Sequence, residues 1–487
     1  MKKYEYDKEK LPEPILKGRE DFISLYYRAW ELAFLNVDYN IKDNWKPFLT
    51  CMPGVNKIWQ WDSCLMTFIT NYSNGTIDAF NNIDILYSLR RESDGYMSMA
   101  YDLNSKEPAF GERINPPIMA WCEWEHYLVS GDNSRFSKVL PALEGFYNFI
   151  EKNRRRVQGL YWFEDPGSSG MDNSPRGGYT SEGLKGSDVC HVDLACQQAM
   201  SAKYISLMYG EIKNIKKKNI YEREHKRILK LINKFHWSDK TGFYYDFFSR
   251  SEAKSKVKLI GNKTSAAFWT LLAGAATKEK KKRLLEHIFN PEEFYTTVPF
   301  ASLSKDDINY NKFGGYWLGG VWAPTNFAVI KGLTETGDEN LAKEASLRYL
   351  EAICSVEKNK KYGSIWEAYA PEDLMPALCE EGEICRKDFV GWSGIAPITM
   401  LIENIIGIRF NANTNTVSFN VSQESGLKNM NFCGGKISIV CTKYGEIEGE
   451  THIEIQTQRP FTLNIKKENS KENRRMEVLI GKTVVSI

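Results

Sequence analysis

Hydrophobic positions between residues 20 and 404 recur about every 3.6 residues, a period typical of helices that bury one face. In the stretch 213–236, Tyr221, Ile228 and Ile232 lie on one stripe, whereas Lys226 and Lys230 lie off it. About twelve such segments are expected, each separated from the next by a loop. They span residues 20–37, 62–73, 76–91, 116–130, 136–153, 189–210, 213–236, 263–275, 277–289, 322–336, 338–357 and 392–404.

Short connections between several of these segments, such as Asn74-Gly75 and residues 336–338, favour antiparallel helix hairpins. About twelve helices in six hairpins can close into an (α/α)6 toroid, and an open helical solenoid is the alternative. The chain shows no fixed-period repeat, and its long loops are very unequal, which favours a single-pocket enzyme. The long loops, rich in Gly and Trp, cover residues 40–61, 92–115, 157–188, 290–321 and 358–391.

After about residue 408 the hydrophobic period changes to two, as in Val417, Phe419 and Val421. This alternation predicts a small antiparallel, sandwich-like β-domain whose role is packing. The expected domains are therefore an N-terminal extension (1–19), a helical catalytic domain (20–407) and the β-domain (408–487).

The composition argues against several classes of protein, namely nucleic-acid-binding, membrane-spanning and disulfide-rich proteins. The 487 residues carry 64 Lys and Arg against 62 Asp and Glu, so a formal net charge of +2 predicts no affinity for nucleic acid or a membrane surface. No apolar run approaches the length of about 18 residues that a membrane span requires, and the ten cysteines include no Cys-x-x-Cys pair. We therefore expect a soluble, cytoplasmic protein with free thiols. The aromatic content of 13% hints at rings that face a ligand.

Two stretches place carboxylates where chemistry is possible. The loop 164–176 holds three carboxylates, Glu164, Asp165 and Asp172, among residues that break helices, although an ordinary Asx-turn loop would have the same composition. The stretch 362–372 places Glu367 between Trp366 and Tyr369, whose rings would desolvate it and raise its pKa. Two facing carboxylates suffice for glycoside hydrolysis, but sequence spacing predicts no distance between them.

Two further stretches combine aromatic rings with polar groups or close-packed glycines. Trp59-Gln60-Trp61-Asp62 opens a helix, where Asp62 serves either as a cap or as an acceptor for sugar hydroxyls. Residues 314–326 mix Gly and Trp, for which packing alone is an alternative reading. No nucleophile elbow, phosphate loop or metal-ligand spacing is present, and His191 is expected to be structural. We expect neither a metal nor a cofactor.

As an ordered set, these stretches resemble glycoside hydrolase family 63 and its trehalase-related neighbours, most closely the bacterial branch with mannosylglycerate and glucosylglycerate hydrolases. The resemblance covers most of residues 50–410. The matching pieces are Trp59-x-Trp61-Asp62, Asn115-Pro116-Pro117, Ser169-Gly170-Met171-Asp172-Asn173-Ser174-Pro175-Arg176, Tyr316-Trp317-x-Gly319-x-Val321-Trp322 and Trp366-Glu367-x-Tyr369.

The resemblance implies an (α/α)6 barrel and an inverting attack on an α-glycosidic bond, with Asp172 as general acid and Glu367 as general base. Inversion requires the two carboxyl groups to lie about 6.5 to 9.5 Å apart, and Asp172 must be protonated near neutral pH. Many relatives carry Gln where this chain has Asn115 and Arg where it has Leu318, which leaves the substrate open. The implied substrate-binding residues are Trp59, Trp61, Asp62, Asn115, Gly170, Arg176, Trp317, Trp322 and Tyr369.

The sequence therefore predicts an inverting α-glycosidase acting on a small α-glucoside or α-mannoside, of the disaccharide or glycosylglycerate type. A sugar epimerase or lyase is an alternative because helical toroids host those activities too. A carbohydrate-binding toroid without hydrolysis is a second alternative. The sugar, the linkage, the aglycone and the oligomeric state do not follow from the sequence.

Overall fold

The computed structural model describes residues 4–39, 45–176, 186–249, 257–445, 447, 449–468 and 473–487. The first three residues of the expected N-terminal extension lie outside this part of the chain. No helix within the described ranges is both long enough and apolar enough to cross a membrane.

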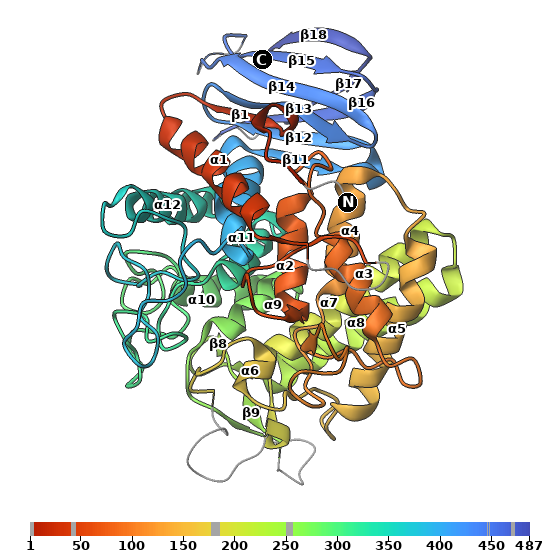
Figure 1. The fold of residues 1–487 in the computed structure, drawn as a ribbon, viewed down its shortest axis with the longest axis vertical. Helices are drawn as coiled ribbons and strands as arrows, with labels where there is room; N and C mark the ends of the chain where they lie inside the picture. The colour runs from red at the N-terminus through yellow and green to blue at the C-terminus, as the bar shows by residue number, and fades with distance from the viewer. Residues whose placement is uncertain are drawn as a thin grey trace.

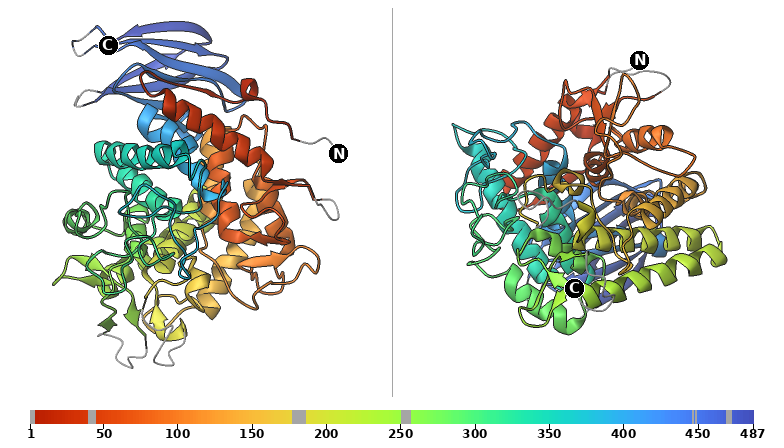
Figure 2. Two further views of the ribbon diagram at one scale, coloured as in Figure 1. Left: turned by 60° about the vertical axis from the view of Figure 1, so that its left-hand side comes forward. Right: turned by 90° about the horizontal axis from the view of Figure 1, so that it is seen from below.

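Six helical segments form a closed inner ring. Each packs against the next in chain order, and the sixth packs back against the first. Seen from below, the segments follow one another around the molecule (Figure 2). The six are α2 (Gln60–Thr70), α4 (Met119–Ser130), α7 (Val192–Glu211), a 3-10 turn with α9 (Ser265–Phe268 and Trp269–Leu272), α11 (Ala323–Glu335), and a 3-10 turn that continues into a π-helix (Trp392–Ile395 and Ala396–Ile406).

Six further helices lie outside this ring, which confirms the predicted (α/α)6 toroid (Figure 1). Burial explains which helices lie inside: every residue of α2 is buried, whereas α8 buries only Tyr221, Ile228, Ile232 and Phe235. A helix that is apolar all round needs neighbours on every side, and a helix with one apolar stripe needs only one. The outer helices are α1 (Glu20–Leu35), α3 (Phe80–Leu89), α5 (Phe136–Asn153), α8 (Ile215–Phe235), α10 (Lys278–Ile288) and α12 (Glu339–Lys358).

Two sheets at one end of the molecule form the C-terminal β-domain (Figure 1). The five-stranded sheet has the order β1-β13-β14-β15-β18, and the four-stranded sheet has the order β11-β12-β16-β17. Their strands are β1 (Glu13–Leu16), β11 (Ile408–Asn411), β12 (Thr416–Val421), β13 (Ser425–Phe432), β14 (Gly435–Lys443), β15 (His452–Thr457), β16 (Phe461–Lys467), β17 (Asn473–Val478) and β18 (Gly481–Ser486).

Two features of these sheets differ from the sequence expectation. Strand β1, from the expected N-terminal extension, pairs antiparallel with β13 and so belongs to the C-terminal sheet. Strands β12 and β16 run parallel, although every other pair in the two sheets is antiparallel. Period-two alternation identifies a strand but not its partner or its direction, because both depend on distant parts of the chain.

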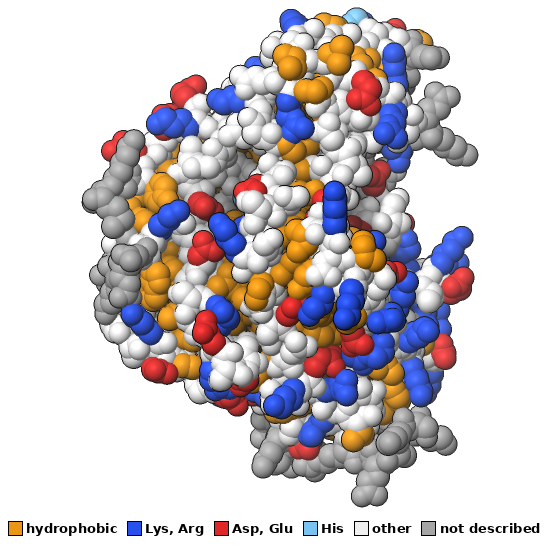
Figure 3. All heavy atoms as spheres, turned by 90° about the vertical axis from the view of Figure 1, so that its right-hand side faces the viewer, with side chains coloured by type: hydrophobic (Ala, Val, Ile, Leu, Met, Phe, Trp, Pro, Cys, Tyr) orange, Lys and Arg blue, Asp and Glu red, His pale blue; other side chains and the backbone are white. Residues whose placement is uncertain are grey.

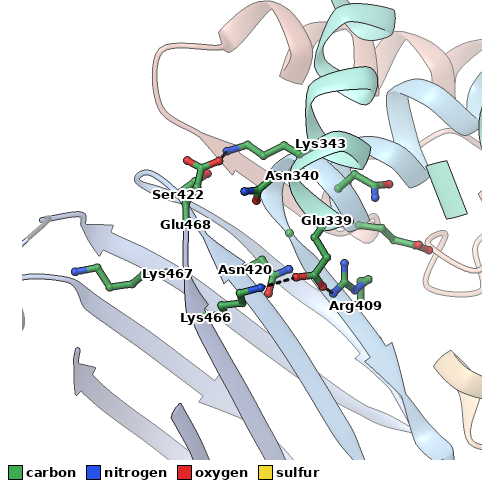
Figure 4. Close-up of a pocket in the computed structure, with 12 residues that line it drawn as sticks. Glu339, Asn340, Lys343, Arg409, Asn420, Ser422, Lys466, Lys467 and Glu468 are labelled. Carbon is green, nitrogen blue, oxygen red and sulfur yellow. Dashed lines mark hydrogen bonds and ion pairs between the residues drawn. The ribbon is translucent and has the colours of Figure 1, made fainter. Parts of the chain in front are cut away.

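Ion pairs join the β-domain to the helical domain beside a polar cavity of about 320 Å³ (Figure 4). Glu339 at the start of α12 pairs with Arg409 of β11 and, at 3.2 Å, with Lys466 of β16. Lys343 of α12 pairs with Glu468 at 2.6 Å. The β-domain contacts the π-helix and α4 at the end of the ring that is remote from α6 (Pro166–Ser169) and β9 (Phe247–Phe248) (Figure 1).

The surface agrees with the near-zero net charge of the sequence. On the face that Figure 3 shows, Lys and Arg side chains are interspersed with Asp and Glu, and apolar side chains form only small groups among them. Most of the buried hydrophobic residues of the described ranges form one core.

Candidate active site

A cavity of about 300 Å³ opens at the end of the ring where the inner helices begin. Its walls combine residues from the N-terminal ends of α2 and of the segment 392–395 with residues from all five long loops. The residues that line it are Met52, Trp59, Trp61, Asp62, Met99, Phe110, Arg113, Asn115, Gly167, Gly170, Asp172, Tyr316, Trp317, Glu367, Arg386, Phe389 and Trp392. Eight of these are among the predicted site residues, namely Trp59, Trp61, Asp62, Asn115, Gly170, Asp172, Trp317 and Glu367.

Asp172 follows the short helix α6 in the first of the two carboxylate-bearing stretches. The helix ends at Gly170, whose φ of 76° lies in the left-handed region. A Cβ atom at this position would lie 1.4 Å from Cζ3 of Trp61, so only glycine lets the loop pass over that ring. Asp172 thereby projects its carboxyl group into the cavity.

The pKa of Asp172 is raised to about 7. Its side chain is exposed to the cavity, yet protein atoms surround it closely, and this desolvation is the largest cause. The negative charges of Glu367, Asp62 and Asp165 raise the pKa further, while a hydrogen bond with Tyr316 lowers it. About half of the Asp172 carboxyl groups are therefore protonated at pH 7.

Glu367 is buried and held by backbone hydrogen bonds on both sides. Its own N–H donates to the carbonyl oxygen of Arg386 at 2.9 Å, and the N–H of Arg386 donates to Oε2 of Glu367 at 3.2 Å. The pKa of Glu367 is raised, chiefly by burial and also by the charge of Asp62, although the N–H and the positive charge of Arg386 and the hydroxyl of Tyr316 each lower it. These groups favour the ionised form of a carboxyl that burial alone would neutralise.

Tyr316 connects the two carboxyl groups and was not predicted as a site residue. Its hydroxyl donates to Oε1 of Glu367 at 3.4 Å and also interacts with Asp172. The φ of Tyr316 is 62°, a left-handed backbone conformation that is rare for a residue with a bulky side chain. The preceding Gly314 and Gly315, both with positive φ, were the sequence signal for this unusual turn.

Tryptophan rings form one wall of the cavity. Trp61 and Trp317 stack at a centroid distance of 6.4 Å, and Trp317 stacks on Trp322 at 4.3 Å with an angle of only 2° between the rings. Flat apolar faces of this kind suit the apolar face of a pyranose ring. Trp392, which was not predicted as a site residue, extends the same wall, with its ring centroid 6.2 Å from that of Trp61.

Two polar groups in the walls are oriented by specific contacts. The thiol of Cys51 donates to Oδ1 of Asp62 at 2.9 Å, and Asp62 is buried in the first turn of α2. The amide of Asn115 donates to the carbonyl oxygen of Ser168 at 3.1 Å and so joins the start of α4 to α6. Both residues line the same cavity.

Three predicted substrate contacts lie behind the walls. Arg176 is fully buried against two aspartates, Trp322 is fully buried behind Trp317, and the hydroxyl of Tyr369 accepts a hydrogen bond from the N–H of Trp366. None of the three lines the cavity in the described part of the chain. The structure therefore assigns them supporting positions, because their polar or aromatic groups are already occupied by protein.

Two arginines at the cavity were missed by the sequence reasoning. Arg113, which is paired with Asp165 at 2.6 Å, and Arg386, which is exposed, both line the wall. Leu318, where many relatives carry Arg, does not line it. Both arginines belong to long polar loops, where nothing in the local pattern distinguishes a ligand-facing arginine from a solvated one.

The closed ring and an aromatic cavity that contains Asp172 and Glu367 are the features of a glycoside hydrolase of the (α/α)6 toroid class. Residues 56–377 match the mannosylglycerate hydrolase MGH1-like glycoside hydrolase domain. The chain belongs to this family, among glycoside hydrolases of the family 63 and trehalase-like group.

Individual relatives agree with this assignment. An uncharacterized protein of Borreliella burgdorferi is 30% identical over 423 residues, which are 85% of each chain. The mannosyl-oligosaccharide glucosidase of Saccharomyces cerevisiae is 21% identical over 61% of this chain and 35% of its own length. The crystal structure of the family 63 mannosylglycerate hydrolase of Thermus thermophilus with glucose has a TM-score of 0.61 and 18% identity over 77% of this chain and 100% of that chain.

Proposed function

We propose that this protein is an inverting hydrolase of a small α-glucoside or α-mannoside, with Asp172 as general acid and Glu367 as general base. One observation carries the proposal: both carboxyl groups line one aromatic-walled cavity, and the charge of Glu367 raises the pKa of Asp172. Glycosidases use two carboxyl groups in this way, and environments that make the two groups differ in protonation assign their roles.

Asp172 donates the proton that the leaving group needs. Because its pKa is about 7, a large fraction of Asp172 is protonated under neutral conditions, unlike an ordinary aspartate with a pKa of 3.8. In the reaction, the Asp172 proton moves to the glycosidic oxygen as the bond between that oxygen and the anomeric carbon breaks.

Glu367 activates the attacking water. Its carboxylate removes a proton from a water molecule whose oxygen forms the new bond to the anomeric carbon on the face opposite the leaving group. The N–H of Arg386 and the hydroxyl of Tyr316 support the ionised form of Glu367. The α-glycoside then yields a β-configured sugar, and no covalent sugar–enzyme bond forms.

The cavity walls suggest how the substrate is oriented. The Trp61 and Trp317 rings give the cavity an apolar wall beside the sugar, and the carboxyl of Asp62 can accept hydrogen bonds from its hydroxyls. The guanidinium groups of Arg113 and Arg386 suit an aglycone with a carboxylate, as in a glycosylglycerate. The mannosylglycerate hydrolase of Thermus thermophilus has been crystallised with Tris and D-glycerate.

The proposal is tested by following the anomeric protons by NMR while the enzyme is incubated with single substrates. The panel contains α-glucosylglycerate, α-mannosylglycerate, trehalose and the corresponding β-glycosides as matched controls. We expect one α-glycoside to be cleaved and the β-anomer of its sugar to appear before mutarotation. First appearance of the α-anomer would refute inversion, and binding or isomerisation without cleavage would refute hydrolysis.

Variants assign the two roles. Asp172→Asn and Glu367→Gln should each reduce turnover of the identified α-glycoside by at least about 100-fold, while thermal melts show that the fold survives. Substantial residual turnover in a folded variant would remove that residue from its proposed role.

A further inference from the structure

Arg176, at the end of the loop that carries Asp172, makes a buried network of ion pairs. Its Nη1 and Nη2 donate to the two oxygens of Asp193 at 2.6 and 2.7 Å. Its Nε and Nη2 donate to the two oxygens of Asp246 at 2.8 and 3.0 Å. The Nη1 group also lies 3.7 Å from Sδ of Met171, the buried residue directly before Asp172. A guanidinium held at both edges is immobile, and so is the chain attached to it.

The two aspartates attach Arg176 to the N-terminus of the inner helix α7. Oδ1 of Asp246 accepts from the N–H of Val192 at 2.8 Å, and Asp193 itself lies in the first turn of the helix. Burial by itself raises the pKa of Asp246, but the charge of Arg176 outweighs it, so the pKa is lowered. Asp246 is therefore ionised in the neutral range, whereas burial raises the pKa of Asp193 against the opposing charge of Arg176.

The beginning of the same loop is tied to the same helix end. The N–H of Phe163 donates to Nδ1 of His191, the residue at the N-cap of α7, at 3.1 Å. Burial lowers the pKa of His191 to about 3, so its ring is neutral and its Nδ1 accepts this hydrogen bond at physiological pH. The loop 164–176 thus leaves and returns to one fixed point of the inner ring.

We infer that Arg176 is a positioning residue for Asp172: it fixes the end of the loop to α7 and thereby sets the place of the carboxyl group in the cavity. The inference rests on the proposed function and replaces the sequence prediction that Arg176 contacts substrate. Asn173 attaches the loop to a second segment, residues 315–317. Its side-chain N–H donates to the carbonyl oxygen of Gly315 at 2.9 Å, and its Oδ1 accepts from the N–H of Trp317 at 2.8 Å. Both anchors, Asn173 and Arg176, follow Asp172 within four residues, so they fix the chain on the C-terminal side of the carboxyl group.

The test compares two substrates that differ in their need for an acid. An α-glycosylglycerate requires protonation of its leaving oxygen, whereas fluoride leaves an α-glycosyl fluoride without a proton. Arg176→Lys keeps the positive charge but loses the planar guanidinium that bonds both aspartates at once. In this variant we expect kcat for the glycosylglycerate to fall by about 100-fold with little change in KM. Hydrolysis of the fluoride of the same sugar should fall by less than about threefold, because it does not depend on where Asp172 lies.

Controls separate positioning from stability. Arg135→Lys alters another arginine that is paired with a buried carboxylate, that of Glu123, and should affect both substrates equally if it affects them at all. Asp193→Asn, which removes one of the two partners of Arg176, should reproduce the selective loss to a smaller degree. Thermal melts accompany each variant.

Other outcomes overturn the inference. Equal losses on both substrates would mean that the network only holds the fold, and so would failure of both Arg176→Lys and Asp193→Asn to fold. A raised KM with unchanged kcat would mean that Arg176 contacts substrate after all. Wild-type protein that cleaves neither an α-glucosyl nor an α-mannosyl probe would overturn the proposed function itself, and the positioning role with it.

Discussion

Replacement of Glu367 by Gln tests whether the two carboxyl groups share one electrostatic environment. Burial is the largest cause that raises the pKa of Asp172 to about 7, and the charge of Glu367 is the next largest. The substitution removes this charge, keeps the size of the side chain and leaves the burial of Asp172 unchanged. We therefore expect the pKa of Asp172 to fall in the variant but to remain above the ordinary value of 3.8.

The size of this change follows from the geometry that inversion requires. Two unit charges about 6.5 to 9.5 Å apart interact by about 1.7 to 2.6 kcal/mol when the effective dielectric constant is about 20. Since about 1.36 kcal/mol corresponds to one pKa unit, the pKa of Asp172 should fall to between about 5 and 6. Burial, which the substitution does not alter, accounts for the remaining elevation.

The assay is a pH titration of Asp172 by NMR of protein labelled with ¹³C at the aspartate carboxyl groups, with Asp172→Asn to assign the signal. Wild-type kcat/KM should decline as the pH rises through about 7, because the general acid acts in its protonated form. Glu372→Gln, on the same segment as Glu367, is the matched control and should leave the pKa of Asp172 near 7. An Asp172 pKa that is unchanged or higher in Glu367→Gln would refute a shared cavity.

Three more substitutions test the walls of the site. Gly170→Ala should lower kcat/KM by at least about 100-fold in steady-state kinetics, because the new methyl group would occupy the place of the Trp61 ring; near-normal activity would contradict this packing. Tyr316→Phe should move both limbs of the pH–rate profile to higher pH, because the Tyr316 hydroxyl lowers the pKa of both carboxyl groups. It should also lower kcat by about tenfold. A profile with unchanged limbs would show that the hydroxyl contacts neither Asp172 nor Glu367. Cys51→Ala should raise KM a few-fold with kcat nearly unchanged, because Asp62 loses its thiol donor. Cys51→Ser, which keeps a donor, should resemble the wild type. Identical KM values in both variants would argue against a role of this hydrogen bond.

The helical part of the fold was predictable because its signal is local. The period of 3.6 residues depends only on neighbours in the chain, so α8 and α12 begin and end within about two residues of the expected positions. The ring could be predicted only from the number of hairpins. The pairing of β1 with β13 could not be predicted, since it joins residues more than 400 positions apart and no periodicity encodes a partner.

The candidate site was predictable only in part, for a related reason. Asp172 and Glu367 stand in stretches of unusual composition, but only the resemblance distinguished Asp172 from Glu164 and Asp165 in the same loop. The role of Arg176 depends instead on Asp193 and Asp246, and burial by these partners turns an expected ligand contact into an anchor. The place of Arg386 in the wall likewise depends on the backbone pairing of its segment with Glu367. Composition indicates that a residue is polar, but only the fold determines which group it meets.

The environments of the two carboxyl groups support the same assignment of acid and base as the resemblance, by an independent argument. Burial raises the pKa of Glu367, and the charge of Asp62 raises it further, but the N–H and the charge of Arg386 and the hydroxyl of Tyr316 all oppose this by favouring the carboxylate. Asp172 lies near three negative neighbours, Glu367, Asp62 and Asp165, which favour the protonated acid. Ionisation of Glu367 therefore adds to the effect of burial in keeping Asp172 protonated. The site favours the state in which Asp172 can give a proton and Glu367 can take one.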